Sequence, residues 1–165
     1  IHGAYNAKGE YEIYAVAGQK LGSNYHKLYK IENNTAKELS TNNINGGEGA
    51  LDGVWFTPGG DYYVVGDGIF RKTLTLNSTL PWKDLGSRLT QYYSYAISGT
   101  NVNDFFVANA FDELLHFNGV QWHSYTDAGF SQIIFKGIVI KDNLVVVYGV
   151  NYGYRVGTVI IGRRN

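Results

Sequence analysis

Short runs of apolar, strand-forming residues recur along this chain, and polar turns rich in Gly, Asn and Asp separate them. Aromatic and β-branched residues fill the runs, and both residue types favour β-strands. The turn residues tolerate the backbone angles that tight turns need. No stretch shows the 3.6-residue periodicity of an amphipathic helix. The pattern therefore predicts an all-β protein.

Four of the runs are heptamers that resemble one another. They are EIYAVAG (12–18), YYVVGDG (62–68), FFVANAF (105–111) and LVVVYGV (144–150), and successive heptamers are spaced by 50, 43 and 39 residues. A shorter apolar segment and a polar turn precede each heptamer, and two further strand-like pieces follow each of the first three. A repeat of four short strands every 40–45 residues or so is typical of a β-propeller blade.

The sequence therefore predicts one domain, 1–165, built as a β-propeller-type array of four antiparallel blades of about 40–50 residues each. The approximate blades are 1–48, 49–90, 91–132 and 133–165. A β-sandwich would supply strands at similar intervals, but it does not require the same internal order in every unit. Because only GTVIIGRR (157–164) follows the last heptamer, we expect the last blade to lack its outer strand.

The incomplete last blade and the first residue suggest a longer natural protein. The chain opens at Ile1 on an apparent strand, without a signal peptide, so we expect a processed or trimmed polypeptide. We expect it to be the C-terminal part of a propeller of about seven or eight blades, with a four-bladed ring as the alternative. The partners expected to cover its end blades are the remaining blades of that propeller or a second copy of the chain.

The third unit contains the clearest hairpin signal, because Asn118-Gly119 lies between two strand-like runs. Asn and Gly both tolerate positive φ, so the pair predicts a two-residue turn. With that turn, Leu115 lies opposite Trp122. A large ring so placed gains most from burial, and we expect Trp122 to pack against the next blade rather than bind a ligand.

Composition narrows the classes of partner. Apolar residues make up 44% of the chain and charged residues 17%, which is typical of a globular protein. The 14 basic and 14 acidic residues balance, so the basic excess of a nucleic-acid binder is not seen. No run approaches the roughly 20 apolar residues of a membrane-spanning helix, and we expect no membrane insertion. Cysteine is absent, which excludes disulfides and thiolate metal sites.

Two stretches carry a resemblance to a known repeat. GTNVNDFFVANAFDELLHFNGVQWHSYT (99–126) and DGVWFTPGGDYYVVGDGIFRKT (52–73) resemble the bacterial propeller repeat with a VWG…DVWAVG..G.I.HY.G..W cadence, although Phe105 and Tyr62 stand where that repeat often has Trp. The resemblance implies an exported bacterial protein: extracellular, periplasmic or on the cell surface. The repeat motif is structural, so it implies no catalytic residue.

Three residues are candidates for ligand binding. Asp52, Tyr93 and Lys136 occupy similar places at the start of the innermost strands of units 2, 3 and 4. In a propeller those strand ends surround the mouth of the central channel. A carboxylate, a phenol and an ammonium gathered there can bind a sugar or a peptide, or serve acid–base chemistry. The alternative is that all three are solvated or locally paired.

His116 and His123 are weaker candidates, for a metal site. Both fall on one face of the predicted hairpin, diagonally offset, and imidazoles are common zinc and copper ligands. No third ligand is apparent in the sequence, so we predict neither a metal nor another cofactor.

These observations predict a non-catalytic module that binds carbohydrate or protein, or acts as a scaffold. The alternative is a glycan-processing enzyme, a hydrolase or a lyase, with its site at the channel mouth. The Asp and Glu residues are scattered through turns, so no catalytic pair of carboxylates can be selected.

Overall fold

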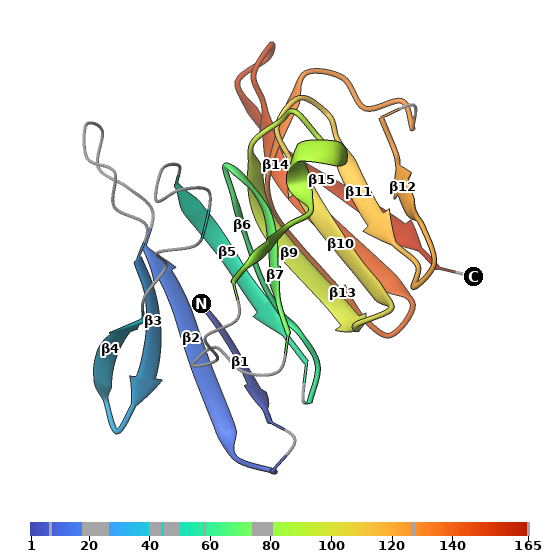
Figure 1. Cartoon of the computed structure of the whole chain (residues 1–165). Helices are drawn as coiled ribbons and strands as arrows, with labels where there is room; N and C mark the ends of the chain where they lie inside the picture. The colour runs from blue at the N-terminus through green and yellow to red at the C-terminus, as the bar shows by residue number, and fades with distance from the viewer. Residues whose placement is uncertain are drawn as a thin grey trace. The chain divides into compact units, whose positions relative to one another are not determined.

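The structure is a computed structural model that describes residues 1–6, 8–17, 27–39, 44, 50–57, 59–73, 81–126 and 128–164 (Figure 1). These residues form four antiparallel sheets and one 3-10 turn, η2 (Gly86–Arg88), so the all-β prediction is confirmed. None of the described helical residues forms a helix long and apolar enough to cross a membrane.

Each sheet is completed before the chain begins the next one. The first sheet contains β1 (His2–Tyr5), β2 (Tyr11–Ala17), β3 (Lys27–Glu32) and β4 (Thr35–Leu39). The second contains β5 (Leu51–Phe56), β6 (Tyr62–Gly66), β7 (Gly68–Lys72) and β8 (Lys83–Asp84). The third contains β9 (Ser94–Asn101), β10 (Asp104–Asn109), β11 (Leu114–Phe117) and β12 (Trp122–Ser124). The fourth contains β13 (Ile133–Lys141), β14 (Leu144–Asn151) and β15 (Val156–Arg163).

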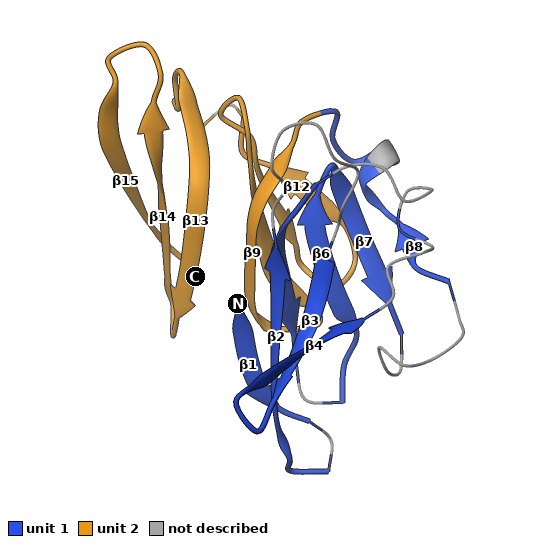
Figure 2. Ribbon diagram, turned by 90° about the vertical axis from the view of Figure 1, so that its left-hand side faces the viewer, with its two compact units in different colours: residues 1–91 blue, residues 92–165 orange. Residues whose placement is uncertain are grey.

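Strands that are neighbours in sequence are neighbours in every sheet. The four heptamers supply the second strand of each sheet, β2, β6, β10 and β14, as the repeat predicts. The fourth sheet has three described strands where the others have four. The chain divides into two compact units, residues 1–91 with the first two sheets and residues 92–165 with the last two (Figure 2).

Each unit has an apolar core between its two sheets. In unit 1, Tyr14 of β2 meets the ring of Phe56 edge-on, and Phe56 is stacked on Tyr62. In unit 2, Phe106 of β10 belongs to the same core cluster as Phe135 of β13. Because side chains alternate between the two faces of a strand, one face of each sheet supplies these residues.

In unit 2, Asp112 connects the third sheet to the fourth. It lies in the β10–β11 turn, where Phe111 and Asp112 both have positive φ, 54° and 66°. The Asp112 carboxylate accepts hydrogen bonds from the backbone N–H groups of Gln132 and Ile133, and its own N–H donates to the Ile133 carbonyl. This turn therefore fixes where β13 begins against the third sheet.

The predicted two-residue turn at Asn118-Gly119 is wrong. Phe117 pairs with Trp122, and residues 118–121 form the loop between β11 and β12. The side-chain oxygen of Asn118 accepts hydrogen bonds from the N–H groups of Val120 and Gln121. These bonds favour the longer loop, and only Gly119 in it has a positive φ, 89°.

The longer loop moves the partner of Trp122 from Leu115 to Phe117 but leaves the ring on the same face. There the half-buried ring contacts Phe105 edge-on and also Phe117. The fourth sheet packs against the opposite face of the third sheet, through residues such as Phe106. The expectation that Trp122 packs against the next sheet is therefore wrong, because it lies on the other face.

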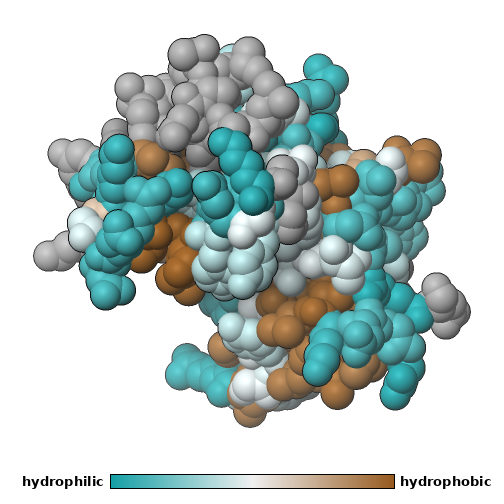
Figure 3. Space-filling model, turned by 90° about the horizontal axis from the view of Figure 1, so that it is seen from below, coloured by the Kyte–Doolittle hydropathy of each residue, from teal (hydrophilic) through white to brown (hydrophobic). Residues whose placement is uncertain are grey.

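Apolar side chains remain exposed on two sheets. Tyr5 and Tyr11 of the first sheet are 60% and 57% exposed. In the fourth sheet, Val139 pairs with Val146 and Tyr148 with Val159 on the face turned away from the unit 2 core. Val139 and Val159 are 58% and 64% exposed. Figure 3 shows apolar side chains gathered in patches on one face of the molecule.

Candidate functional site

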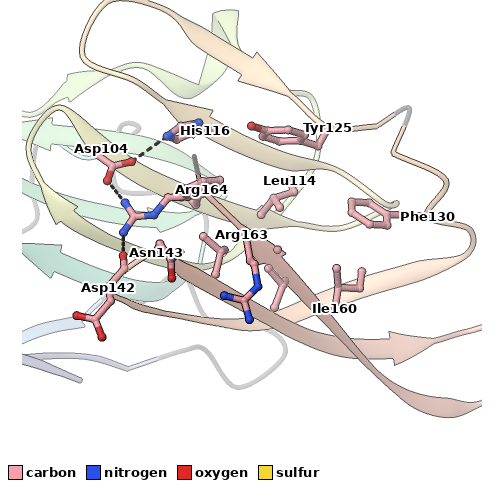
Figure 4. Close-up of a pocket in the computed structure, with 14 residues that line it drawn as sticks. Asp104, Leu114, His116, Tyr125, Phe130, Asp142, Asn143, Ile160, Arg163 and Arg164 are labelled. Carbon is pink, nitrogen blue, oxygen red and sulfur yellow. Dashed lines mark hydrogen bonds and ion pairs between the residues drawn. The ribbon is translucent and has the colours of Figure 1, made fainter.

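A pocket of about 750 Å³ lies within unit 2, between the third and fourth sheets (Figure 4). Its walls are mostly apolar. Strands β10 and β11 supply Phe106 and Leu114, and β14 and β15 supply Val145, Val147 and Ile160. The polar residues that line it are Asp104, His116, Asp142, Asn143, Arg163 and Arg164. A largely apolar pocket with a few polar groups is the usual form of a binding site.

The polar groups at one end of the pocket bind one another. The Asp104 carboxylate, at the start of β10, accepts a hydrogen bond from His116 Nε2 at 3.0 Å and forms an ion pair with Arg164. Arg164 follows β15, and its guanidinium also donates to the backbone carbonyl of Asp142, as the dashed lines in Figure 4 show. This network joins the two central strands of the third sheet, β10 and β11, to the end of the fourth sheet.

The network keeps Asp104 ionised. Partial burial by itself raises the pKa of the carboxyl. The hydrogen bonds from Thr100, His116 and Arg164 and the positive charge of Arg164 together lower it by more, so the pKa lies below its ordinary value. An ionised Asp104 neutralises Arg164. The side chains of both residues are about a quarter exposed or less, 24% and 21%.

An aromatic wall lies beside this network. The His116 ring is stacked on Phe106, with centroids 3.9 Å apart and planes 4° apart. Tyr125 lies nearly parallel to both rings, at 6.4 Å from each. At the far end of the pocket, Phe130 meets Phe135 edge-on. A flat, semi-polar surface of this kind suits another planar or apolar group.

The buried Arg164 Nε has no hydrogen-bond partner in the described structure. The two terminal nitrogens of the same guanidinium are already used, one by Asp104 and the other by the Asp142 carbonyl. The Asp104 carboxylate and the terminal nitrogens of Arg164 are therefore held by contacts within the chain. They are suited to shaping a pocket and marking its polar end.

Two of the ligand-binding candidates predicted from sequence lie at β-bulges. In β5, Asp52 is the extra residue between Leu51, which pairs with Gly66, and Gly53, which pairs with Val65. Lys136 is the extra residue in β13 in the same way. Bulges are often found beside functional sites because they redirect a side chain. Both side chains are exposed.

In the third sheet the matching bulge residue is Tyr95, because Ala108 pairs with Ala96 and Asn109 with Ser94. Tyr93 lies just before β9, and its ring is 4.9 Å from that of Tyr95. The Lys136 ammonium lies 3.3 Å from the centroid of the Tyr95 ring. The structure therefore gathers Tyr93, Tyr95 and Lys136 within unit 2, whereas Asp52 belongs to unit 1.

The two histidines proposed as weak metal ligands are direct cross-strand partners rather than diagonal neighbours, because of the longer loop. His116 is held by Asp104, and the exposed His123 meets Tyr125 edge-on at 4.5 Å. Within the described ranges, no group of three or more His, Cys, Asp or Glu side chains is placed to hold a metal ion.

Sequence reasoning did not select Asp104, Arg164 or Tyr125. Asp104 and Arg164 are 60 residues apart, and no local pattern links a turn carboxylate to an arginine near the end of the chain. No model of a known protein family matches the chain, and no curated protein sequence matches it. The function is therefore inferred from the pocket and from the arrangement of the sheets.

Proposed function

We propose that this chain is a non-catalytic, protein-binding module, and that the pocket of unit 2 receives apolar side chains of its partner. The observation that supports this most is that Asp104, His116 and Arg164 are bound to one another. A sugar needs many free hydrogen-bonding groups, and here the accessible surface is mostly aliphatic and aromatic. Burial of apolar groups is the favourable term that such a surface offers.

The same network favours binding over catalysis. A general acid works best with a pKa near the pH of the reaction, and the pKa of Asp104 is lowered, not raised. The ion pair with Arg164 further stabilises the ionised form. The glycan-processing alternative would need a carboxyl with a raised pKa beside the pocket or at the bulge residues.

In this proposal the four sheets are successive blades of a single β-propeller-type domain. The same backbone hydrogen bond recurs in three of the sheets and supports this proposal. In each, the residue after the second strand donates its N–H to the carbonyl of the residue just before the first strand. The three bonds are Asp67 to Ala50, Ala110 to Tyr93 and Tyr152 to Gln132. The strict order of neighbouring strands also favours blades over a sandwich, in which strands commonly cross between sheets.

The resemblance to bacterial propeller repeats supports an exported or surface-attached protein. The exposed apolar faces of the first and fourth sheets support covering by further blades or by a second copy of the chain. The Tyr93, Tyr95 and Lys136 group of unit 2 and, separately, Asp52 of unit 1 remain candidates for further contacts with a partner.

Two kinds of probe test the choice between protein and carbohydrate. We expect N-acetyl-leucinamide and N-acetyl-phenylalaninamide, at millimolar concentration, to raise the midpoint of thermal unfolding by a few degrees, because a ligand that binds only the folded state stabilises it. Cellobiose and diacetylchitobiose should leave the midpoint unchanged.

The Tyr125→Ala variant is the matched control, because it removes one wall of the pocket and should abolish the response to the amides. Stabilisation by the disaccharides alone would contradict protein binding. Release of reducing ends from a glycan by the wild-type chain would favour the enzyme instead.

A further inference from the structure

Three of the four sheets end in short or charged outer strands. The outermost strands β8 and β12 have two and three residues, and β4 exposes Lys37 and Glu38. Short and charged edge strands are common means of preventing a sheet from pairing with another chain. Three of the outer edges are thus protected.

The outer edge of the fourth sheet is different. Strand β15 has eight residues, VGTVIIGR, with no proline, lysine or acidic residue. Its apolar residues Val156, Val159 and Ile161 are 51%, 64% and 68% exposed. Figure 2 shows β15 at the open side of its sheet, and no described strand pairs with that side. A long, apolar edge of this kind is a template for pairing.

The hydrogen-bond pattern of the sheet shows which backbone N–H and C=O groups of β15 point to the open edge. The Arg164 N–H donates to the Asn143 carbonyl, so in the antiparallel ladder every second residue from Arg164 backwards bonds to β14. The N–H and C=O groups of the residues between them, including Val159 and Ile161, point to the open edge. Ile160 and Gly162, on the same strand, line the pocket. Alternate side chains of an added strand would therefore lie beside the pocket.

The charge of this sheet indicates the chemistry of the occupant. Residues 133–164 contain five basic side chains and one acidic one, although the whole chain balances 14 of each. Arg155 and Arg163 lie at the two ends of β15 and are both exposed. A second β15 paired antiparallel would bring each arginine close to its counterpart at the opposite end. That repulsion disfavours a second copy, and the same arginines favour an acidic partner.

We propose that β15 binds an extended, acidic segment of a partner protein as a fourth strand of this sheet. This inference rests on the proposed protein-binding function and names the partner class. The segment alternates apolar residues, whose side chains enter the pocket, with others that face solvent, and it carries Asp or Glu near its ends. The backbone bonds supply affinity and the pocket selects the side chains.

Selection from a phage-displayed library of random nine-residue peptides tests the inference. We expect the enriched peptides to alternate apolar residues and to contain at least two acidic residues. A synthetic copy of an enriched peptide should bind at least tenfold more weakly to Val159→Pro, because this change removes an N–H at the open edge and leaves the bonds to β14 intact. Val159→Thr, which keeps the N–H and is a good strand former, should bind within about threefold of wild type.

Two further measurements do not depend on the proline variant folding. Peptide binding to the wild-type chain should slow hydrogen exchange at the amides of Gly157, Val159 and Ile161. The Arg155→Glu/Arg163→Glu double variant should bind at least tenfold more weakly. Unchanged exchange at these amides, or enrichment of basic peptides, would overturn strand addition.

The outcomes separate the two proposals. Peptides that lose affinity for Tyr125→Ala but bind Val159→Pro as well as wild type would leave the pocket function standing and overturn strand addition. Equal binding to all variants, or no enrichment at all, would overturn both. A dimer that is abolished by Val159→Pro would identify a second copy as the occupant and contradict the acidic partner.

Discussion

Asp104 and Arg164 form an ion pair that joins the start of β10 to the residue after β15. Because this pair also fixes His116 against Phe106, it determines the shape of one end of the pocket. Arg164 lies only partly in solvent, so removing its partner leaves a positive charge that is poorly hydrated. The pair therefore matters both for stability and for the form of the binding site.

The first prediction concerns pH and the Asp104 carboxyl. Its pKa is lower in the folded chain than in the unfolded one. Its contribution is therefore complete above the ordinary pKa of about 4 and is lost as the pH falls through the lower folded value. We expect Asp104→Asn to lower the free energy of unfolding by about 1–2 kcal/mol at pH 7 and to flatten its dependence on pH below 4.

Urea denaturation at a series of pH values measures both effects. Asp142→Asn is a suitable control, because Asp142 is exposed and Arg164 contacts its backbone carbonyl rather than its carboxylate. An Asp104→Asn variant with the same acid dependence as wild type would show that the pair contributes nothing.

The second prediction concerns the turn that positions β13. Asp112→Ala removes the acceptor for two backbone N–H groups and places Ala at a φ of 66°. We expect a loss of about 2–4 kcal/mol in the free energy of unfolding. Asp112→Asn tolerates the same backbone angle and keeps one acceptor oxygen, so it should cost about half as much. Equal losses for the two variants would mean that the side-chain hydrogen bonds are unimportant.

The third prediction concerns Trp122, which is half-buried against Phe105 and Phe117. We expect Trp122→Ala to destabilise the fold by about 2 kcal/mol, less than the 3–5 kcal/mol typical of a fully buried ring. Trp122→Phe should recover most of that loss. A chemical denaturation midpoint that does not change in Trp122→Ala would contradict a packing role.

The fourth prediction concerns association through the exposed face of the fourth sheet. If another copy covers that face, light scattering should detect species larger than 18.4 kDa at micromolar concentration. Val139→Lys should reduce their amount, because a charge in an apolar interface is costly. Val120→Lys, in an exposed loop, should not. A well-folded wild-type monomer would leave further blades of a longer chain as the proposed cover.

Much of the strand pattern was predictable because it is local. The heptamers contain aromatic and β-branched residues bounded by turns, and each proved to be the second strand of its sheet. The loop at residues 118–121 was not predictable from the Asn-Gly pair, because the Asn118 side chain accepts two backbone N–H groups and lengthens the loop. A competing side-chain hydrogen bond of this kind changes the register without changing the propensities.

The candidate site was less predictable than the strands. The pocket depends on which face of the third sheet meets the fourth, and Arg164 reaches Asp104 across 60 residues. The bulge residue of the third sheet was also not predictable from the sequence. One extra residue in β9 makes Tyr95 the equivalent of Asp52 and Lys136. The sequence pattern predicted Tyr93, which lies two positions earlier.

The most direct test of the central claim, that the pocket of unit 2 binds apolar side chains of a protein partner, is the methyl NMR signal of Ile160. This residue lines the pocket from β15. During titration of the wild-type chain with N-acetyl-phenylalaninamide, we expect the δ1 methyl signal of Ile160 to move progressively and saturate. The methyl signals of Val120, which is 90% exposed in a loop, should stay in place. An Ile160 signal that does not move, or that moves only with a disaccharide, would contradict the claim.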